Sequence, residues 1–442
     1  MNISGATAKS MSYWVAPGRT LFNNGTATWN GAGISGAGGA TFANNGTLTL
    51  GGDFSLVNAG GNAPVLRNYT TMILSNGADF TLSSATLDNR AGAGIYFNNG
   101  SITVGAGGIA TNSGLLNLDG GSFFQFSGAT LELGGAVNAP AHNSLRFAGT
   151  AAYIITTNIA APSFWLQAGT IYQTTNVVVT ALNQQNGTFY GTLPVAWNNY
   201  NMTNGELRGA NVTITNFVWL GGALNSENAN SNSVTIPPTG TLTISGPTAK
   251  SLSDYSGGNG RRLVNQGTGT WSGAGISGGH GPQFNNSGTL SLSGDFSYVN
   301  AGGTGLPQLN NTGTLDLNSG ADFTLTSAVL NNFSNVNVTA GSLTVGGGSI
   351  ATNTGTLTLD APSFFQFSGA TLNLGGTVIS PGNNSLRFNG TTAYITTTDI
   401  ASPSYWLQAG TIYQTTNFVV NALNQQNGTF YGTLPLAFAN YS

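Results

Sequence analysis

The amino-acid sequence predicts an all-β protein, a right-handed parallel β-helix (β-solenoid) with coils of about 21–25 residues. The prediction rests on a short repeat that returns along most of the chain, and on apolar residues that alternate with polar ones inside it. It also rests on a density of glycine and asparagine through which no helix of ordinary length can be drawn. The right hand is expected because connections between parallel strands favour it.

The short repeat has the form apolar-x-Asn-x-Gly-Thr-apolar-x-apolar, as in residues 284–292. We expect its asparagine at a corner, where the side-chain amide can hydrogen-bond the same residue one coil away. The glycine that follows is expected to supply the positive φ of a tight corner. The asparagines at this position predict two ladders of five: Asn23, Asn44, Asn68, Asn89 and Asn112, then Asn265, Asn286, Asn311, Asn332 and Asn353.

The residues after each such asparagine alternate in character. Leu48 and Leu50 share one parity, and Thr47 and Thr49 share the other. Alternation with a period of two is typical of a strand with one buried and one solvated face. The same scheme predicts buried side chains for Leu290, Leu292, Leu315, Leu317, Leu357 and Leu359, and exposed ones for Thr289, Thr314 and Thr356.

A second, longer period of about 241 residues contains the short one. Residues 101–200 return without a gap as residues 342–441, with about three-quarters of the positions identical. This predicts a first repeat unit at residues 1–241 and an incomplete second unit at residues 242–442, continuous with the first. Residues 1–3 align with residues 242–244 in mid-chain, so we expect the sequence to begin inside a longer array. The expected partners are neighbouring repeats of the same protein, with end-to-end self-association.

The composition sets limits on the class of protein. Of the 442 residues, 5% are charged and 40% are hydrophobic, the net charge is −3 and cysteine is absent. That much apolar surface favours an ordered chain over a disordered one. The charge gives no basic face for nucleic acid, and apolar runs such as residues 217–220 are too short to insert into a membrane. Without cysteine, neither disulfides nor thiolate chemistry is available, and we expect no cofactor.

Several segments of the chain resemble a known class of surface protein. Residues 7–10 (TAKS), 24–29 (NGTATW) and 45–50 (NGTLTL) are similar to the large repetitive bacterial proteins of the filamentous-haemagglutinin and autotransporter-passenger type. The resemblance implies a right-handed β-helix displayed outside the cell or on the bacterial cell surface. It implies a structural stalk or adhesin segment without catalysis.

Recurring carboxylates are the sequence feature that most favours an enzyme or a calcium site. Their pairs in the two copies are Asp53/Asp295, Asp79/Asp322 and Asp119/Asp360. Each lies in a turn-like context, where an aspartate caps nearby backbone N–H groups, and a single active site needs no duplicate. The two histidines, His142 and His280, are not reproduced between copies and are interpreted as exposed turn residues. We therefore predict no catalytic or metal-binding residues.

Aromatic residues offer a candidate for glycan binding. Trp165, Tyr172 and Tyr190 return as Trp406, Tyr413 and Tyr431. Exposed along one face, these rings would stack on sugars and bind surface glycans; otherwise they fill the core. The alternative functions are therefore a glycan-binding module or polysaccharide-cleaving enzyme on the same coil. A self-assembling extracellular filament subunit is a further alternative, because uncapped coils offer unpaired strand edges.

Thr-x-Thr pairs also raise the alternative of ice binding by a flat array of hydroxyl groups. The pairs at residues 26–28 and 47–49 fit such an array. Asn335 and Asn337 occupy the equivalent positions of another coil and interrupt it.

Overall fold

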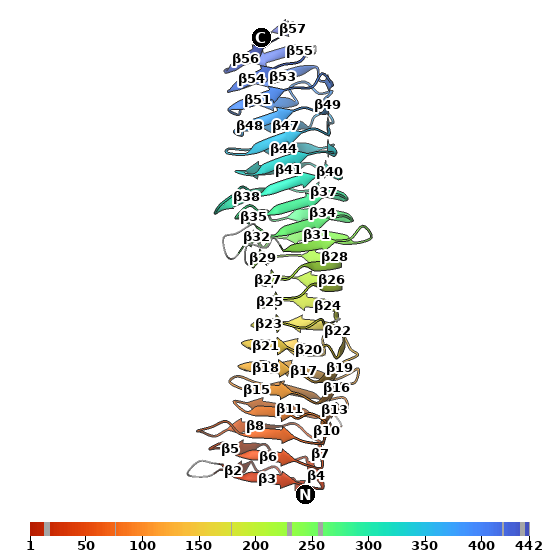
Figure 1. The fold of residues 1–442 in the computed structure, drawn as a ribbon, viewed down its shortest axis with the longest axis vertical. Coiled ribbons are helices and arrows are strands. Elements are labelled where there is room, and N and C mark those ends of the chain that lie inside the picture. The colour runs from red at the N-terminus through yellow and green to blue at the C-terminus, as the bar shows by residue number, and fades with distance from the viewer. Residues whose placement is uncertain are drawn as a thin grey trace. The chain divides into compact units, whose positions relative to one another are not determined.

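The computed structural model describes residues 1–12, 18–75, 77–177, 179–227, 232–254, 260–417, 420–433 and 438–441. Over these ranges the chain is all β, without helices, and its parallel strands stack into a β-solenoid of about 19 turns (Figure 1). It divides into two compact units, Met1–Ala210 and Asn211–Ser442. The boundary between the sequence repeats, after residue 241, lies inside the second of these units.

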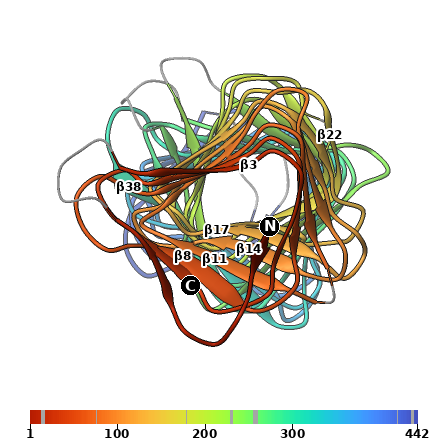
Figure 2. The ribbon, with the colours of Figure 1, turned by 90° about the horizontal axis from the view of Figure 1, so that it is seen from below.

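A typical coil of the first unit contributes one short strand to each of three faces. The ladder face contains β3 (Thr20–Asn23), β6 (Thr41–Asn44), β9 (Val65–Asn68), β12 (Thr86–Asn89), β15 (Ile109–Asn112), β18 (Thr130–Leu133), β21 (Ala151–Ile154), β23 (Thr170–Gln173), β25 (Thr188–Gly191) and β27 (Glu206–Gly209). The threonine face contains β1 (Asn2–Ile3), β4 (Thr26–Trp29), β7 (Thr47–Leu50), β10 (Thr71–Leu74), β13 (Gly94–Phe97), β16 (Leu115–Asn117) and β19 (Ala136–Asn138). The third face contains β2 (Lys9–Met11), β5 (Ile34–Gly36), β8 (Phe54–Asn58), β11 (Asp79–Ser83), β14 (Ser101–Val104), β17 (Phe123–Phe126) and β20 (Leu145–Phe147). Seen along the stack, β3 lies on one side of the coil and β8, β11, β14 and β17 on another (Figure 2).

The second unit repeats these faces after one long strand, β28 (Val212–Trp219), which pairs with β30 and β31. Its ladder face contains β30 (Ser233–Ile236), β33 (Arg262–Asn265), β36 (Gln283–Asn286), β39 (Gln308–Asn311), β42 (Val329–Asn332), β45 (Ile350–Asn353), β48 (Thr371–Leu374), β51 (Thr392–Ile395), β54 (Thr411–Gln414) and β56 (Thr429–Gly432). Its threonine face contains β31 (Thr241–Gly246), β34 (Thr268–Gly273), β37 (Thr289–Ser293), β40 (Thr314–Asn318), β43 (Asn335–Val338), β46 (Thr356–Leu359), β49 (Thr377–Ile379) and β52 (Ile400–Ala401). Its third face contains β29 (Gly222–Ser226), β32 (Lys250–Asp254), β35 (Ile276–Gly279), β38 (Phe296–Gly302), β41 (Ala321–Thr326), β44 (Gly341–Val345), β47 (Phe364–Phe367), β50 (Leu386–Phe388), β53 (Ser404–Leu407), β55 (Val420–Gln425) and β57 (Phe438–Tyr441).

Coil length varies more than the sequence repeat suggests. In the first unit the threonine face and the third face merge into the long strands β22 (Ile159–Leu166), β24 (Val179–Gln184) and β26 (Val195–Met202). Because a corner is lost there, Tyr172 pairs with Tyr190 only 18 positions further along. In the second unit Gly222 pairs with Lys250, a coil of 28 residues. The asparagine-marked coils keep to the predicted range. Some coils without that marker also keep to it, such as the 21 residues from Leu133 to Ile154, and others fall outside it.

The repeated asparagines form the two ladders that their spacing predicts. In the first unit each Nδ2 donates to Oδ1 of the next ladder asparagine, over donor–acceptor distances of 2.7, 2.8, 2.8 and 2.6 Å. In the second unit the corresponding distances are 2.8, 2.9, 2.8 and 2.6 Å. All ten side chains are buried. Each amide therefore finds a partner in the next coil instead of water, which is the condition for burying it without a large penalty.

The glycines beside the ladders have a different role from the one that the sequence suggested. The prediction that they adopt positive φ is wrong, because Gly46, Gly288 and Gly313 are not among the residues with positive φ. The backbones of neighbouring coils approach so closely that a Cβ on Gly288 would lie 2.0 Å from the carbonyl oxygen of Gly267. Glycine is required for this approach and not for its conformational freedom.

Replacing Gly288 with alanine should therefore destabilise the protein by about 1–3 kcal/mol or more, since the added methyl group meets backbone that cannot turn away. Gly347 provides the matched control, because a Cβ there has no atom within 4 Å. Thermal unfolding of the two alanine variants tests the contact. Equal melting temperatures would show that the coils relax apart at Gly288.

The interior follows the predicted alternation of side chains. The six leucines predicted to be buried are buried. Each unit also buries an indole stacked on a phenylalanine, Trp29 on Phe54 and Trp271 on Phe296, with ring centroids 4.8 and 4.9 Å apart. Of the threonines predicted to be exposed, Thr289 is exposed, whereas Thr314 and Thr356 are half-buried. Outward side chains of neighbouring coils stand only about 4.8 Å apart and shield one another.

Candidate functional site

The tyrosines of the predicted glycan site lie on the ladder face, in register from coil to coil. Tyr153 on β21 pairs with Tyr172 on β23, which pairs with Tyr190 on β25. Tyr153 and its counterpart in the second unit are not among the residues predicted from the sequence. The second unit has the same arrangement through Tyr394, Tyr413 and Tyr431.

The tyrosine rings face one another more than they face solvent. The rings of Tyr153 and Tyr172 are stacked, with centroids 4.9 Å apart and an interplanar angle of 12°. Tyr172 and Tyr190 meet edge to face at 5.7 Å. In the second unit Tyr394 stacks on Tyr413 at 5.3 Å. Sugar stacking needs a free ring face, and the stacked pairs cover one face of each of their rings, although Tyr153 and Tyr394 are still exposed. Tyr431, with 55% of its surface exposed, is the most open of the set.

The two tryptophans of the predicted site lie on a different face from the tyrosines. Trp165 belongs to the part of β22 that continues the third face, where it pairs with Arg146 of β20. Trp406 on β53 pairs with Arg387 of β50 in the same way. Both indoles are half-buried. The structure therefore separates the residues proposed for glycan stacking into a tyrosine column and a tryptophan cluster, and does not bring them into one stripe.

An arginine sandwich organises each tryptophan cluster. The Cζ atom of Arg146 lies 3.8 Å from the ring centroid of Phe123 and 5.3 Å from that of Trp165. In the second unit Arg387 lies 3.6 Å from the Phe364 centroid and 5.5 Å from the Trp406 centroid. Desolvation by burial lowers the pKa of Arg146 and likewise that of Arg387. The recurrence of Phe, Arg and Trp in both copies was the sequence signal that could have revealed this site.

An amide network fixes the backbone below each sandwich. The Nε of Arg146 donates to the carbonyl oxygen of Asn143 at 3.0 Å. Asn143, which has a φ of 58°, accepts at Oδ1 from the Nδ2 of Asn183, two coils further along, at 2.7 Å. Asn183 in turn accepts from the Nδ2 of Asn201 at 3.0 Å. The second unit repeats the first two bonds at 3.1 and 2.6 Å.

The recurring carboxylates bind the neighbouring coil. The backbone N–H of Asp79 donates to Oδ1 of Asp53 at 3.0 Å, and the Ser101 hydroxyl donates to Oδ1 of Asp79 at 2.5 Å. The second unit repeats these bonds at 3.2 and 2.6 Å, with Asp295, Asp322 and Ser342 in the same places. This arrangement connects successive turns.

Asp119 caps a turn of its own coil. Burial by itself would raise the pKa of its carboxyl group. Hydrogen bonds from the Ser122 hydroxyl and from the backbone N–H groups of Asn99 and Gly121 outweigh burial and lower that pKa. Asp119 is therefore ionised at neutral pH, as an acceptor at a turn requires.

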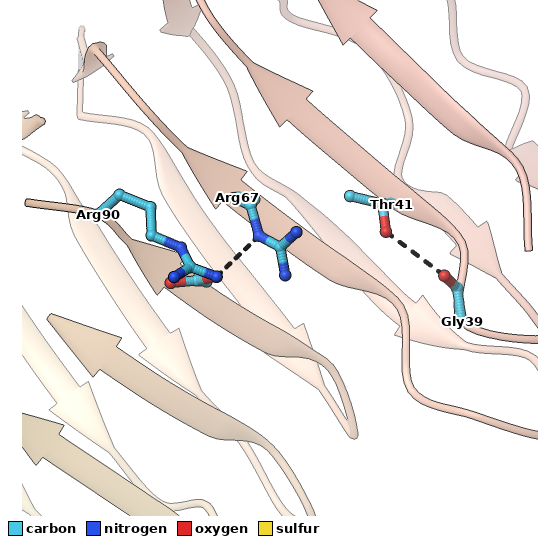
Figure 3. Close-up of polar contacts among 5 residues, drawn as sticks. Gly39, Thr41, Arg67 and Arg90 are labelled. Atoms are coloured by element: carbon cyan, nitrogen blue, oxygen red, sulfur yellow. Dashed lines mark hydrogen bonds and ion pairs between the residues drawn. The ribbon is translucent and has the colours of Figure 1, made fainter.

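An ion-pair cluster on the ladder face of the first unit was not anticipated from the sequence. Arg67 and Arg90 come from neighbouring coils, and the Nε of Arg67 lies on the side of the Arg90 guanidinium group (Figure 3). Asp88 lies between them and accepts from both, over N–O distances of 2.8 and 2.7 Å. In the second unit a neutral ladder stands in this place, Asn285–Asn310–Asn331, with both hydrogen bonds at 2.8 Å. The fold therefore does not require these charges.

A shallow surface hollow of about 480 Å³ lies beside this cluster, at the corner between the ladder face and the threonine face. Its lining includes Thr70, Gly92, Gly94 and Tyr96. The Tyr96 ring lies over Gly94, since a Cβ there would come within 2.6 Å of it. The hollow is lined largely by backbone and small side chains, and offers few groups for chemistry.

The remaining candidates have the positions of turn residues. His142 is exposed, as predicted, whereas His280 is half-buried and has a φ of 63°. Within the described ranges no group of three or more His, Cys, Asp or Glu residues is arranged to hold a metal ion. The same ranges contain no helical segment with the length and apolar character of a membrane span.

Comparisons with models of protein families, with curated proteins and with solved structures return no match for this chain. The structure itself defines the class of protein. The parallel coils, the repeated ladders and the internal duplication are those of a repetitive β-solenoid protein.

Proposed function

We propose that this protein is a structural stalk or adhesin segment of a bacterial surface or extracellular fibre protein, and that it has no catalytic role. One observation carries the proposal. In both units the recurring polar side chains, from the asparagine ladders to the Asp53–Asp79–Ser101 series, hydrogen-bond to the next coil.

This use of polar groups suits a mechanical role. A catalytic site needs one constellation whose groups remain available to a substrate. A spacer needs many equivalent contacts between successive turns, so that no turn is a weak point. Duplicating whole coils adds length to a spacer, whereas it adds nothing to an active site. The extracellular location rests on the resemblance to bacterial surface proteins.

Purified full-length chain should show no turnover on a panel of polysaccharides, with or without calcium, and should scatter X-rays in solution as an elongated particle. Turnover that disappears when Asp53 and Asp295 are both changed to asparagine would overturn the proposal in favour of an enzyme. Glu132→Gln is the control, since Glu132 is an exposed carboxylate on the ladder face. Loss of turnover in that variant as well would show a general effect of removing carboxylates, whereas turnover that persists in the Asp53/Asp295 variant would point to a contaminating activity.

Glycan binding remains the second candidate function, favoured by the recurrence of the aromatic residues in both units. The exposed rings of Tyr153 and Tyr394 and the tryptophan clusters are the places where it would occur. A glycan array with the wild-type chain and a Tyr153→Ala/Tyr394→Ala variant separates the two proposals, because a plain stalk binds no glycan.

A further inference from the structure

The third face of each unit carries a guanidinium group without a neutralising carboxylate. Within the described residues Arg146 forms no ion pair, and its only hydrogen bond joins Nε to the Asn143 carbonyl oxygen. Its two terminal nitrogens make no hydrogen bond within the described part of the protein, and neither is a buried unpaired atom. They therefore reach solvent. The same holds for Arg387 in the second unit, whose Nε donates to the Asn384 carbonyl oxygen.

Three other cations of this chain, Arg67, Arg90 and Lys250, are compensated by the protein itself. Arg67 and Arg90 share Asp88. The Nζ of Lys250 donates to the carbonyl oxygens of Gly246 and Thr248 at 3.3 and 3.1 Å. A partly buried charge ordinarily has such a partner, because desolvation penalises the charged form. The flanking rings attract the guanidinium groups of Arg146 and Arg387, yet their terminal N–H donors stay unused.

The sandwich also fixes the plane of the guanidinium group. Phe123 and Trp165 hold it from two sides, and the bond from Nε sets its rotation. A planar group held in this way presents its two terminal nitrogens as a fork of the kind that binds a carboxylate through two parallel hydrogen bonds. Because the donors are already oriented, little conformational entropy is lost when an anion binds.

We propose that Arg146 and Arg387 are the anion-binding groups of two equivalent sites for the carboxylates of an acidic, uronate-type polysaccharide. The half-buried indoles of Trp165 and Trp406 offer apolar contact to the sugar beside each carboxylate. A polymer of uronates suits each site, because it presents the same carboxylate at every sugar and any of these can meet the fork. The proposal does not rest on the stalk function.

Isothermal titration of the full chain with a linear oligogalacturonate tests the sites, with the methyl-esterified oligomer as the neutral counterpart. The acid form should bind, the ester should not, and affinity should fall as salt is added. Changing Arg146 and Arg387 together to glutamine should weaken binding about tenfold or more, since charge-assisted bidentate bonds are lost. Changing both to lysine keeps the charge but removes the fork. The affinity of that variant should therefore lie between those of the wild type and the double glutamine variant.

The double variant Arg19→Gln/Arg262→Gln is the matched control, because both arginines are exposed and their loss changes the net charge by the same two units. Equal weakening by that variant would show non-specific attraction and overturn the proposal, as would unchanged affinity in the double glutamine variant. Tighter, arginine-dependent binding of a sulfated polysaccharide would overturn the assignment to carboxylates. If the glutamine variants lose their β-sheet circular dichroism, the lysine pair decides the test, and full affinity in that pair would contradict the proposed fork.

Discussion

Replacing Asn311 with leucine should lower the free energy of unfolding by about 2–5 kcal/mol, although leucine has nearly the same volume. The Nδ2 of Asn311 donates to Oδ1 of Asn332 and to the Asn335 carbonyl oxygen, both at 2.8 Å, and its Oδ1 accepts from Asn286 at 2.9 Å. With leucine at this position, each of these buried groups would lose a hydrogen bond, and water could not replace it. Denaturation in urea, followed by circular dichroism, measures the effect.

The adjacent residue provides the control for that substitution. Asn310 belongs to a second asparagine ladder with bonds of the same length, to Asn285 and from Asn331, at 2.8 Å each. It is only half-buried, so water can replace its partners, and Asn310→Leu should cost less than about 1 kcal/mol. Equal losses of unfolding free energy in the two variants would mean that burial does not determine how much a ladder hydrogen bond contributes to stability.

Replacing Leu315 with aspartate should lower the free energy of unfolding further still, by about 4 kcal/mol or more. Leu315 is fully buried and stacks in register between Leu290 and Val336. The new carboxylate would have no polar neighbour among these side chains, and burial would raise its pKa. The loss of stability should therefore shrink as the pH falls toward the ordinary range of an aspartate, where the group is neutral.

Thr314→Asp tests whether the loss of stability in the Leu315 variant comes from the buried position or from the added charge. Thr314 is the preceding residue on β40 and faces outward, and Asp316, two positions along, already carries a carboxylate on that side. The Thr314 variant should unfold within about 1 kcal/mol of the wild type. A wild-type melting temperature for the Leu315 variant would mean that the buried and solvated sides are reversed.

The architecture could be predicted from the sequence because its determinants are local and repeated. The spacing of Asn265, Asn286 and Asn311 sets the register, and the alternation around Leu290 and Leu315 assigns the buried side. Each of these signals recurs coil after coil. The coils of 18 residues were missed because they lack the ladder asparagine, so nothing in the repeat marks where β22 merges two faces.

The role of the glycines could not be predicted, since the distance between neighbouring backbones is a property of the packed coils. A sequence does not distinguish a glycine that is needed because a carbonyl oxygen lies close by from one that is needed because the backbone adopts positive φ.

The candidate site was predicted only in part. Trp165 and Tyr172 both recur in the second copy, which suggested a common stripe, but a turn between β22 and β23 carries them to different faces. Arg146 was overlooked because it lies nineteen residues from Trp165 and twenty-three from Phe123. The cluster exists only once the coil stacks these strands. A search restricted to one residue class, aromatic or acidic, misses a site composed of both rings and a cation.

The ladders also bear on how the gene for such a protein can change. Each ladder asparagine bonds to its counterpart one coil away, and the steps in the second unit are 21, 25, 21 and 21 residues. Recombination between copies thus preserves the hydrogen bonds only when it adds or removes a whole number of coils, whatever their individual lengths. Small insertions can be inherited only at corners, where the 25-residue step shows that four extra residues fit. Apart from such small insertions, descendants of such a gene should differ in size by steps of one turn.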